Sequence, residues 1–288
     1  MKRAFLPWVV SLAGISVAAQ DADVPVFSTS IDVVRVDVSV TRDGKPVEHL
    51  KAADFEVRDN GVVQEVSVVG GEDKHVHAVL ALDTSSSVSG PPLKHLKAAA
   101  HAFVDVLGPE DAVSLITFSD QVQVRVTPDE PRQRAHEVVE RAEAHLTTAL
   151  YDATYAALAM ADPVRGRPLV LIFSDGEDVG SWLKPEKVLR VAEASELVAH
   201  VVLAHREGAD VPFLSELSAA TGGEEWRADY GELKDVLLNA LEEFRARYTL
   251  QYTPAGASRD GWHKLQVRVP RTEARVKARK GYWQGRPR

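Results

Sequence analysis

The chain has 288 residues, of which 34 are Lys or Arg and 42 are Asp or Glu, so its formal net charge is −8 at pH 7. This acidic balance argues against nucleic acid as a general partner. Cysteine is absent, which excludes disulfides, thiolate metal sites and a cysteine nucleophile. The length and a hydrophobic content of 45% allow one large and one small domain with ordinary cores.

Residues 1–19 have the features of a secretory signal peptide. Two basic residues at positions 2 and 3 precede a mostly apolar stretch, Ala4 to Val17, which is short for a membrane span. Small residues then lead to a cleavage point expected near Ala19-Gln20. We therefore expect a secreted or periplasmic protein without a stable membrane span after cleavage. An uncleaved membrane anchor is the alternative.

Both flanks of the remaining chain alternate apolar and polar residues with a period of two, which is typical of half-buried antiparallel strands. The clearest examples are Val34 to Val40, Tyr248 to Tyr252 and Leu265 to Val269. Hairpin turns are expected at Asp43-Gly44 and Asn60-Gly61.

Each flank has roughly 40 residues, too few to bury an adequate core alone. We therefore predict that residues 20–72 and 248–288 form one antiparallel β-domain, with residues 73–247 inserted between them. Two separate β-appendages packed on the central domain are the alternative.

Residues 73–247 alternate strands and helices, which predicts a mostly parallel sheet covered on both faces. The expected strands are 78–82, 112–118, 121–126, 167–174 and 200–204, and the expected helices are 91–107, 132–145, 149–162, 185–197, 211–220 and 233–244.

The apolar run from Ala78 to Leu82 is followed by Asp83 and by two hydroxyls, Ser85 and Ser87. In open α/β sheets, ligands bind at the carboxyl ends of the strands. One carboxylate and two hydroxyls suit a hard divalent cation such as Mg2+. A serine-rich turn without a metal is the alternative for these residues taken alone.

Two later segments carry further oxygens. A second apolar strand, 167–174, leads into Asp175, and Leu146-Thr147-Thr148 supplies a threonine at the start of a helix. Together these segments resemble the von Willebrand factor A-type domain and its metal-ion-dependent adhesion site, over roughly residues 74–247. The resemblance implies the metal ligands Asp83, Ser85, Ser87, Thr148 and Asp175.

One position departs from the family pattern. The family often has Gly-Gly before its threonine, whereas this chain has Leu146-Thr147. Thr147 is therefore a rival for the role assigned to Thr148.

The resemblance also implies a fold. The expected architecture is a doubly wound, mostly parallel six-stranded sheet with helices on both faces, inserted in a smaller antiparallel β-domain. This arrangement of segments is similar to that of secreted bacterial proteins with a von Willebrand factor A-related domain.

The function implied is a non-catalytic, adhesion-type module of the bacterial envelope. It would hold Mg2+, or alternatively Mn2+ or Ca2+, and present the cation to an Asp or Glu carboxylate of a protein partner. The sequence identifies neither that partner nor the oligomeric state, and a structural extracellular scaffold without a metal-dependent ligand is an alternative.

A haloacid-dehalogenase-type phosphotransferase is the enzyme alternative. Such an enzyme needs a second aspartate two residues after its nucleophile, and the residue two positions after Asp83 is Ser85. A nucleophile elbow of the Gly-x-Ser-x-Gly type and a Walker phosphate loop are also missing from the sequence. We therefore expect that the protein is not an enzyme.

Overall fold

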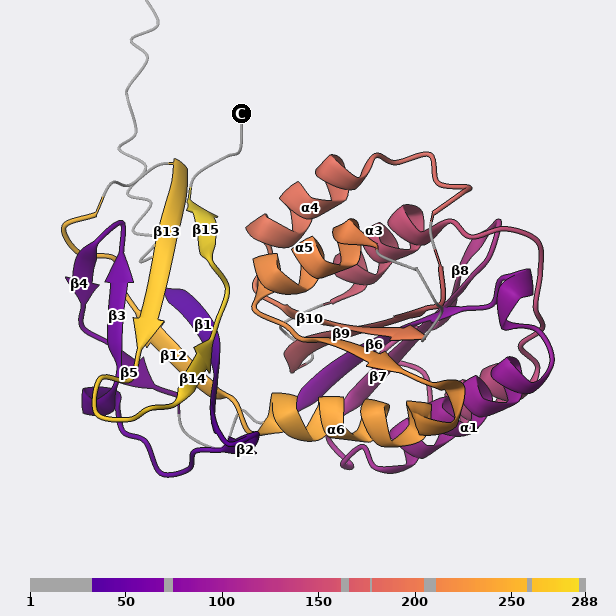
Figure 1. Cartoon of the computed structure of the whole chain (residues 1–288), viewed down its shortest axis with the longest axis horizontal. Coiled ribbons are helices and arrows are strands. Elements are labelled where there is room, and N and C mark those ends of the chain that lie inside the picture. The colour runs from indigo at the N-terminus through magenta and orange to yellow at the C-terminus, as the bar shows by residue number, and fades with distance from the viewer. Residues whose placement is uncertain are drawn as a thin grey trace, which may run out of the picture. The chain divides into compact units, whose positions relative to one another are not determined.

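The computed structural model describes residues 33–69, 75–161, 166–176, 178–204, 211–257 and 261–284. The signal peptide expected at residues 1–19 and the domain boundary expected near residue 72 lie outside these ranges. The described residues form an α/β domain between Val76 and Arg245, and a β-domain built from both flanks (Figure 1).

The α/β domain contains a six-stranded sheet with the strand order β11-β10-β9-β6-β7-β8. Neighbouring strands are parallel except β7 and β8, which form an antiparallel pair at one edge. The predicted mostly parallel, six-stranded sheet is therefore confirmed. The strands are β6 (Val76–Asp83), β7 (Ala112–Phe118), β8 (Val122–Val126), β9 (Arg167–Ser174), β10 (Val198–Ala204) and β11 (Glu225–Ala228).

Helices cover both faces of this sheet. Helices α1, α2 and α6 contribute to the hydrophobic cluster on one face, and α3, α4 and α5 contribute to the cluster on the other. The helices are α1 (Pro91–Asp105), α2 (Gln133–Glu140), α3 (Leu150–Met160), α4 (Pro185–Ala194), α5 (Pro212–Thr221) and α6 (Leu233–Arg245).

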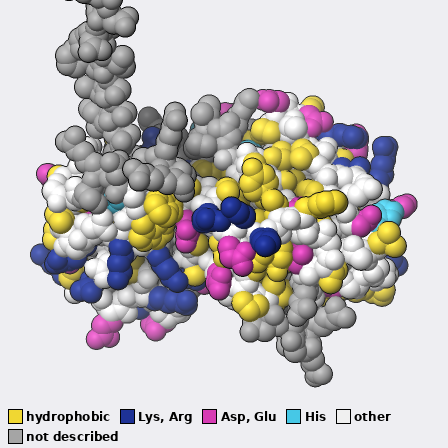
Figure 2. Space-filling view, turned by 90° about the horizontal axis from the view of Figure 1, so that it is seen from above, with side chains coloured by type: hydrophobic (Ala, Val, Ile, Leu, Met, Phe, Trp, Pro, Cys, Tyr) yellow, Lys and Arg dark blue, Asp and Glu magenta, His cyan; other side chains and the backbone are white. Residues whose placement is uncertain are grey.

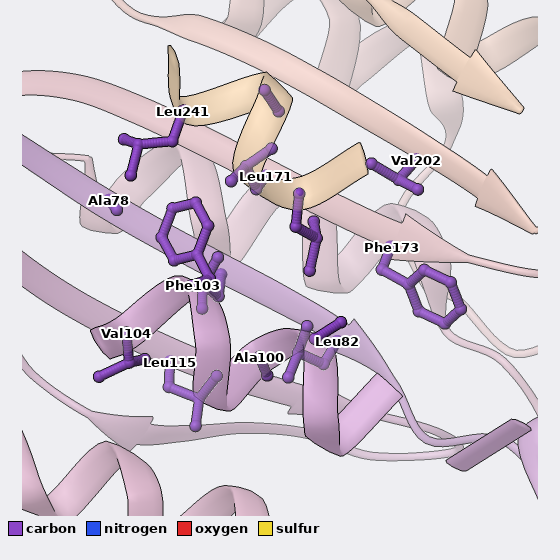
Figure 3. Packing of buried hydrophobic residues seen from close by; sticks show 14 of the residues in the cluster. Ala78, Leu82, Ala100, Phe103, Val104, Leu115, Leu171, Phe173, Val202 and Leu241 are labelled. Carbon is purple, nitrogen blue, oxygen red and sulfur yellow. The ribbon is translucent and has the colours of Figure 1, made fainter. Parts of the chain in front are cut away.

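Strand β6 is buried along its whole length, because alternate side chains enter the two clusters. Ala78 and Leu82 lie among Phe103 of α1 and Leu241 of α6 (Figure 3). Burying a leucine or phenylalanine side chain such as Leu82 or Phe103 contributes roughly 1.5–3 kcal/mol. The central strand is therefore held firmly from both faces, and so is the residue at its carboxyl end.

Two elements differ from the sequence prediction. The helix expected over 132–145 ends at Glu140, because the following residues form a loop that is tied to the end of β6 by a hydrogen bond from His145 N to Thr84 O at 2.8 Å. Strand β11 was not located in the sequence. It has only four residues, of which only Ala228 is fully buried, so it lacks a clear apolar pattern.

The β-domain combines strands from both ends of the chain. Strand β1 (Val34–Arg42) pairs antiparallel with β12 (Tyr248–Tyr252) and β14 (Arg275–Lys277). Strand β3 (Glu56–Asp59) pairs antiparallel with β13 (Gly261–Arg268). The remaining strands are β2 (Lys45–Pro46), β4 (Val62–Gln64), β5 (Ser67–Val68) and β15 (Gly281–Gln284).

The two expected hairpin turns are present in this domain. Asp43 and Asn60 have φ values of 51° and 48°, and each is followed by a glycine that also has positive φ. These turns join β1 to β2 and β3 to β4. One hydrophobic cluster contains side chains from both flanks. The limits 20–72 and 248–288 stay a prediction, because parts of these ranges are not described.

The surface carries both hydrophobic and charged side chains. On the face shown in Figure 2, hydrophobic side chains gather over the α/β domain, while the β-domain on the left presents several Lys and Arg side chains. Within the described ranges, no helix has the length and hydrophobicity needed to cross a membrane.

Candidate metal centre

Asp83 is the last residue of β6, at the carboxyl edge of the sheet, and its side chain is fully buried. Strand β6 pairs in parallel with both β7 and β9, and Leu82 lies opposite Phe173. This register brings Asp83 beside the end of β9. The fold therefore places a buried carboxylate at the edge where α/β sheets bind ligands.

Hydroxyls and a backbone amide surround the Asp83 carboxylate. Its Oδ1 accepts a hydrogen bond from Ser85 N, and its Oδ2 accepts one from Ser174 Oγ, both at 2.8 Å. Ser85 Oγ lies 2.9 Å from Ser87 Oγ, and Ser87 Oγ donates to Oδ1 of Asp175 at 2.8 Å. Four of the five predicted ligands are thus joined in one hydrogen-bonded chain.

The second carboxylate, Asp175, follows β9 directly and is only 3% exposed. Its Oδ2 accepts a hydrogen bond from the hydroxyl of Tyr230 at 3.0 Å. The Tyr230 ring packs edge-on against Phe173, with 6.2 Å between the ring centroids. Tyr230 therefore orients Asp175 from the side of the sheet that α6 covers.

The loop that carries the predicted threonine lies against the Asp83 loop. Leu146 O accepts hydrogen bonds from both Ser86 N, at 3.3 Å, and Ser86 Oγ, at 2.7 Å. Thr148 is buried, whereas its rival Thr147 is exposed. In the described part of the chain, the Thr148 hydroxyl has no hydrogen bond to the other four predicted ligands. The structure brings its loop to the site without joining its side chain to the cluster.

Among the described residues, the two carboxylates have no basic side chain as an ion-pair partner. No Lys, Arg or His in these ranges lies within ion-pair distance of Asp83 or Asp175. Burial, reinforced by the charge of Asp175, raises the pKa of Asp83 to about 6, although hydrogen bonds from Ser85 and Ser174 act in the opposite direction. Buried carboxylates without a cation are costly. A divalent cation would balance the charge of both carboxylates.

The donor set fits a hard cation. Carboxylate and hydroxyl oxygens are ligands of Mg2+, Mn2+ and Ca2+, and the cluster offers no thiolate or imidazole. Within the described ranges, no group of three or more His, Cys, Asp or Glu side chains is placed to hold a metal ion. A metal at this edge would therefore depend on the hydroxyls of Ser85, Ser87 and Thr148 as well as on the two aspartates.

Sequence reasoning missed two residues of the cluster. Ser174 continues the register of β9 next to Asp83, so it could have been found from the assumption that the two strands pair in parallel. Tyr230 gave no signal, because it lies 55 residues from Asp175 and outside any strand or long helix.

The sequence profile of the von Willebrand factor type A domain matches residues 78–177, which include most of β6, strands β7 to β9 and the four joined ligands. The chain contains a von Willebrand factor type A domain. The family resemblance predicted from the sequence is therefore confirmed for this region, which we call the VWA domain. No curated protein matches the chain by sequence.

Solved structures share the fold of the VWA domain. One is proximal thread matrix protein 1 from the mussel byssus, whose metal-ion-dependent adhesion site (MIDAS) motif is occupied by zinc. It is 15% identical to this chain with a TM-score of 0.54, and the match covers 64% of this chain and 49% of that protein. A von Willebrand factor type A protein from Catenulispora acidiphila is 13% identical with a TM-score of 0.53, and the match covers 83% and 75% of the two chains. This chain thus matches about half the length of the mussel protein. Similarity at this level shows the fold alone.

Proposed function

We propose that the VWA domain binds one divalent cation through Asp83, Ser85, Ser87, Thr148 and Asp175, and presents it to a carboxylate of a protein partner. The observation that carries this proposal is the pair of buried carboxylates, Asp83 and Asp175, which hydrogen bonds through serine hydroxyls connect. Among the described residues, no basic side chain lies within ion-pair distance of either carboxylate. A divalent cation would balance both charges at once.

The charge balance also bears on the partner. Two aspartates neutralise a divalent cation, while the hydroxyls of Ser85, Ser87 and Thr148 would add lone pairs without adding charge. Mg2+ takes about six oxygen ligands and normally retains water. An exchangeable water position would accept a stronger oxygen donor, and an Asp or Glu of the partner supplies one. The mussel protein, whose MIDAS motif is zinc-occupied, supports divalent metal binding at this place in the fold.

The proposed setting is extracellular or periplasmic, with an adhesion-type and non-catalytic role. The basic and apolar start of the chain supports this setting. Ser85 supports the non-catalytic role, since it stands where a haloacid-dehalogenase-type enzyme needs an aspartate. A scaffold role without a ligand is the alternative.

Calorimetric titration of the full chain with Mg2+ and Mn2+ tests the metal site. We expect saturable binding that is lost in Asp83→Ala and kept in Asp120→Ala, an exposed acid at the end of the adjacent strand β7. The cation should stabilise the fold by roughly 2.7 kcal/mol at a hundredfold excess over its dissociation constant. Absence of saturable heat, or unchanged binding in Asp83→Ala, would contradict the proposal.

Capture of proteins from envelope extracts, in Mg2+ and in EDTA, tests the partner. We expect proteins that are captured only in Mg2+ and are lost with Asp83→Ala while circular dichroism shows an intact fold. Identical sets of captured proteins in both conditions would favour the scaffold alternative.

A further inference from the structure

Three hydrophobic side chains border the proposed metal site and are strongly exposed. Among the described residues, the three most exposed large hydrophobic side chains are Trp182 at 95%, Leu146 at 70% and Val179 at 69%. All three lie on the two loops that follow α2 and β9, and we call them the apolar rim. Single exposed hydrophobic residues are common, but a group confined to the loops around one site marks an interaction surface.

Hydrogen bonds hold the backbone of each rim residue. Leu146 O accepts bonds from Ser86, the residue between the two serines of the site. Val179 N donates to Thr148 O at 3.0 Å, and Trp182 N donates to Oδ2 of Asp152 at 2.9 Å. Leu146 and Val179 are therefore attached to the loops that carry predicted metal ligands, and Trp182 is attached to the first turn of α3.

The loop of Trp182 is also braced on both sides of the tryptophan. Asp178 Oδ1 accepts a hydrogen bond from Ser181 Oγ at 2.5 Å, and Asp152 Oδ1 accepts one from Leu183 N at 2.9 Å. The indole gains almost no burial from the fold, so these contacts hold the loop backbone that carries an exposed aromatic side chain. Tryptophan is among the residue types that most often dominate the energy of a protein interface, and an ordered backbone lowers the entropic cost of presenting it.

We infer that the apolar rim contacts the residues on either side of the partner's carboxylate, so that the VWA domain recognises an Asp or Glu flanked by large hydrophobic residues on a protein surface. This inference rests on the proposed metal function. The cation supplies attraction for the carboxylate, and the rim supplies the apolar contact area that distinguishes one acidic segment from another. Trp182, as the largest and most exposed member, is the main contact.

A protein segment fits this surface better than a lipid bilayer does. The net charge of −8 disfavours approach to anionic lipids. A cation balanced by two aspartates selects a single carboxylate, which a protein side chain presents beside apolar neighbours. Membrane binding through the same three side chains is kept as an outcome of the test.

The probes are short synthetic peptides in which a central Asp is flanked on both sides by Leu, by Trp or by Ser. Surface plasmon resonance on immobilised peptides measures binding of the full chain in Mg2+ and in EDTA. We expect Mg2+-dependent binding that is at least about tenfold tighter for the Leu- and Trp-flanked peptides than for the Ser-flanked peptide. Trp182→Ala should remove this preference and leave the calorimetric Mg2+ affinity unchanged.

A matched pair of variants controls for loss of exposed hydrophobic surface. Val179→Ser should weaken binding to the Leu-flanked peptide by at least about threefold, while Val63→Ser should leave it unchanged, because Val63 is 56% exposed on β4 of the β-domain.

Three outcomes separate this inference from the proposed function. Equal affinity for all flanks, or no peptide binding by protein that does bind Mg2+, overturns the inference and leaves the metal site standing. Failure to bind Mg2+ overturns the proposed function itself. Trp182-dependent binding to phosphatidylcholine or phosphatidylglycerol vesicles in EDTA would identify the rim as a membrane contact and overturn the inference.

Discussion

The hydroxyl of Ser87 joins two segments that lie 88 residues apart, because it donates a hydrogen bond of 2.8 Å to Oδ1 of Asp175. Ser86, its neighbour, instead donates its hydroxyl to Leu146 O at 2.7 Å. The consecutive residues Ser86 and Ser87 thus make hydrogen bonds to different parts of the structure. Ser87 belongs to the acidic cluster, and Ser86 fastens the adjoining loop.

This division of tasks predicts a contrast between two alanine variants. Ser87→Ala removes a proposed metal ligand, so we expect Mg2+ affinity to fall by at least about tenfold. Ser86→Ala removes a hydroxyl of the same size that does not face the cluster, so affinity should change by less than about threefold. Calorimetric titration measures both. An equal effect of the two substitutions would argue against direct ligation by Ser87.

The threonine loop provides a second contrast. Thr148 is buried two residues before α3 begins, while Thr147 is exposed. We expect Thr148→Ala to weaken Mg2+ binding more than Thr147→Ala, by about tenfold against less than threefold. The reverse order, measured by the same titration, would assign the ligand role to Thr147.

The unfolding free energy should report the cost of burying the Asp83 carboxylate. In the metal-free protein its pKa of about 6 lies above the ordinary 3.8, so its ionisation lowers stability as pH rises between these values. At pH 7 in EDTA, Asp83→Asn should therefore raise the unfolding free energy by up to about 3 kcal/mol. In excess Mg2+ the wild type should gain stability, whereas Asp83→Asn should not.

Urea unfolding in EDTA and in Mg2+ measures the unfolding free energies of the wild type and of Asp83→Asn. Asp120→Asn is the matched control, because its side chain is an exposed carboxylate at the neighbouring strand end, and it should behave as the wild type. If Asp83→Asn destabilised the protein in EDTA, the result would show that other groups of the protein stabilise the ionised Asp83 carboxylate without a metal.

A buried histidine outside the metal centre predicts a pH dependence of stability. His200 is fully buried on β10, with Nδ1 accepting a hydrogen bond from Glu224 N and Nε2 lying 3.0 Å from Oε2 of Glu243. Burial lowers the pKa of His200. Burial acts to raise the pKa of Glu243, but the contacts with His200 and Arg247 outweigh it and hold that pKa well below its usual range.

Both shifts act in the same direction. The unfolded chain binds protons that the folded protein excludes, so stability should fall as pH drops below about 6.5, by about 1.4 kcal/mol per pH unit for His200. Urea unfolding between pH 7.5 and pH 5 should show this fall, and His200→Gln should remove much of it. His49→Gln, at an exposed histidine, should leave the profile unchanged. An unaltered slope in His200→Gln would contradict the assignment.

The domain prediction has a direct test. A fragment of residues 73–247 should fold alone and bind Mg2+, because both hydrophobic clusters of the α/β domain consist of its own residues. It loses contacts such as the ion pair between Arg167 and Asp37, 2.5 Å apart, so it should unfold at a lower urea concentration than the full chain. An unfolded circular dichroism spectrum would contradict independent folding.

Local sequence patterns determined much of this protein. Apolar runs and their spacing predicted most strands and helices of the α/β domain, and glycine turns predicted both hairpins of the β-domain. Asp83, Ser85 and Ser87 could be recognised as oxygen donors because they lie within five positions of one strand end. These features depend on neighbours along the chain, which is why the sequence alone predicted them.

The tertiary structure decided which other residues lie beside those oxygen donors. Parallel pairing of β6 with β9 brings Ser174 and Asp175 to the Asp83 cluster, and packing against Phe173 brings in Tyr230. The position of Trp182 beside the site likewise depends on a hydrogen bond from its backbone N–H to Asp152 of α3. Such contacts join residues tens of positions apart, and their register is set by the packing of whole elements, which no local pattern records.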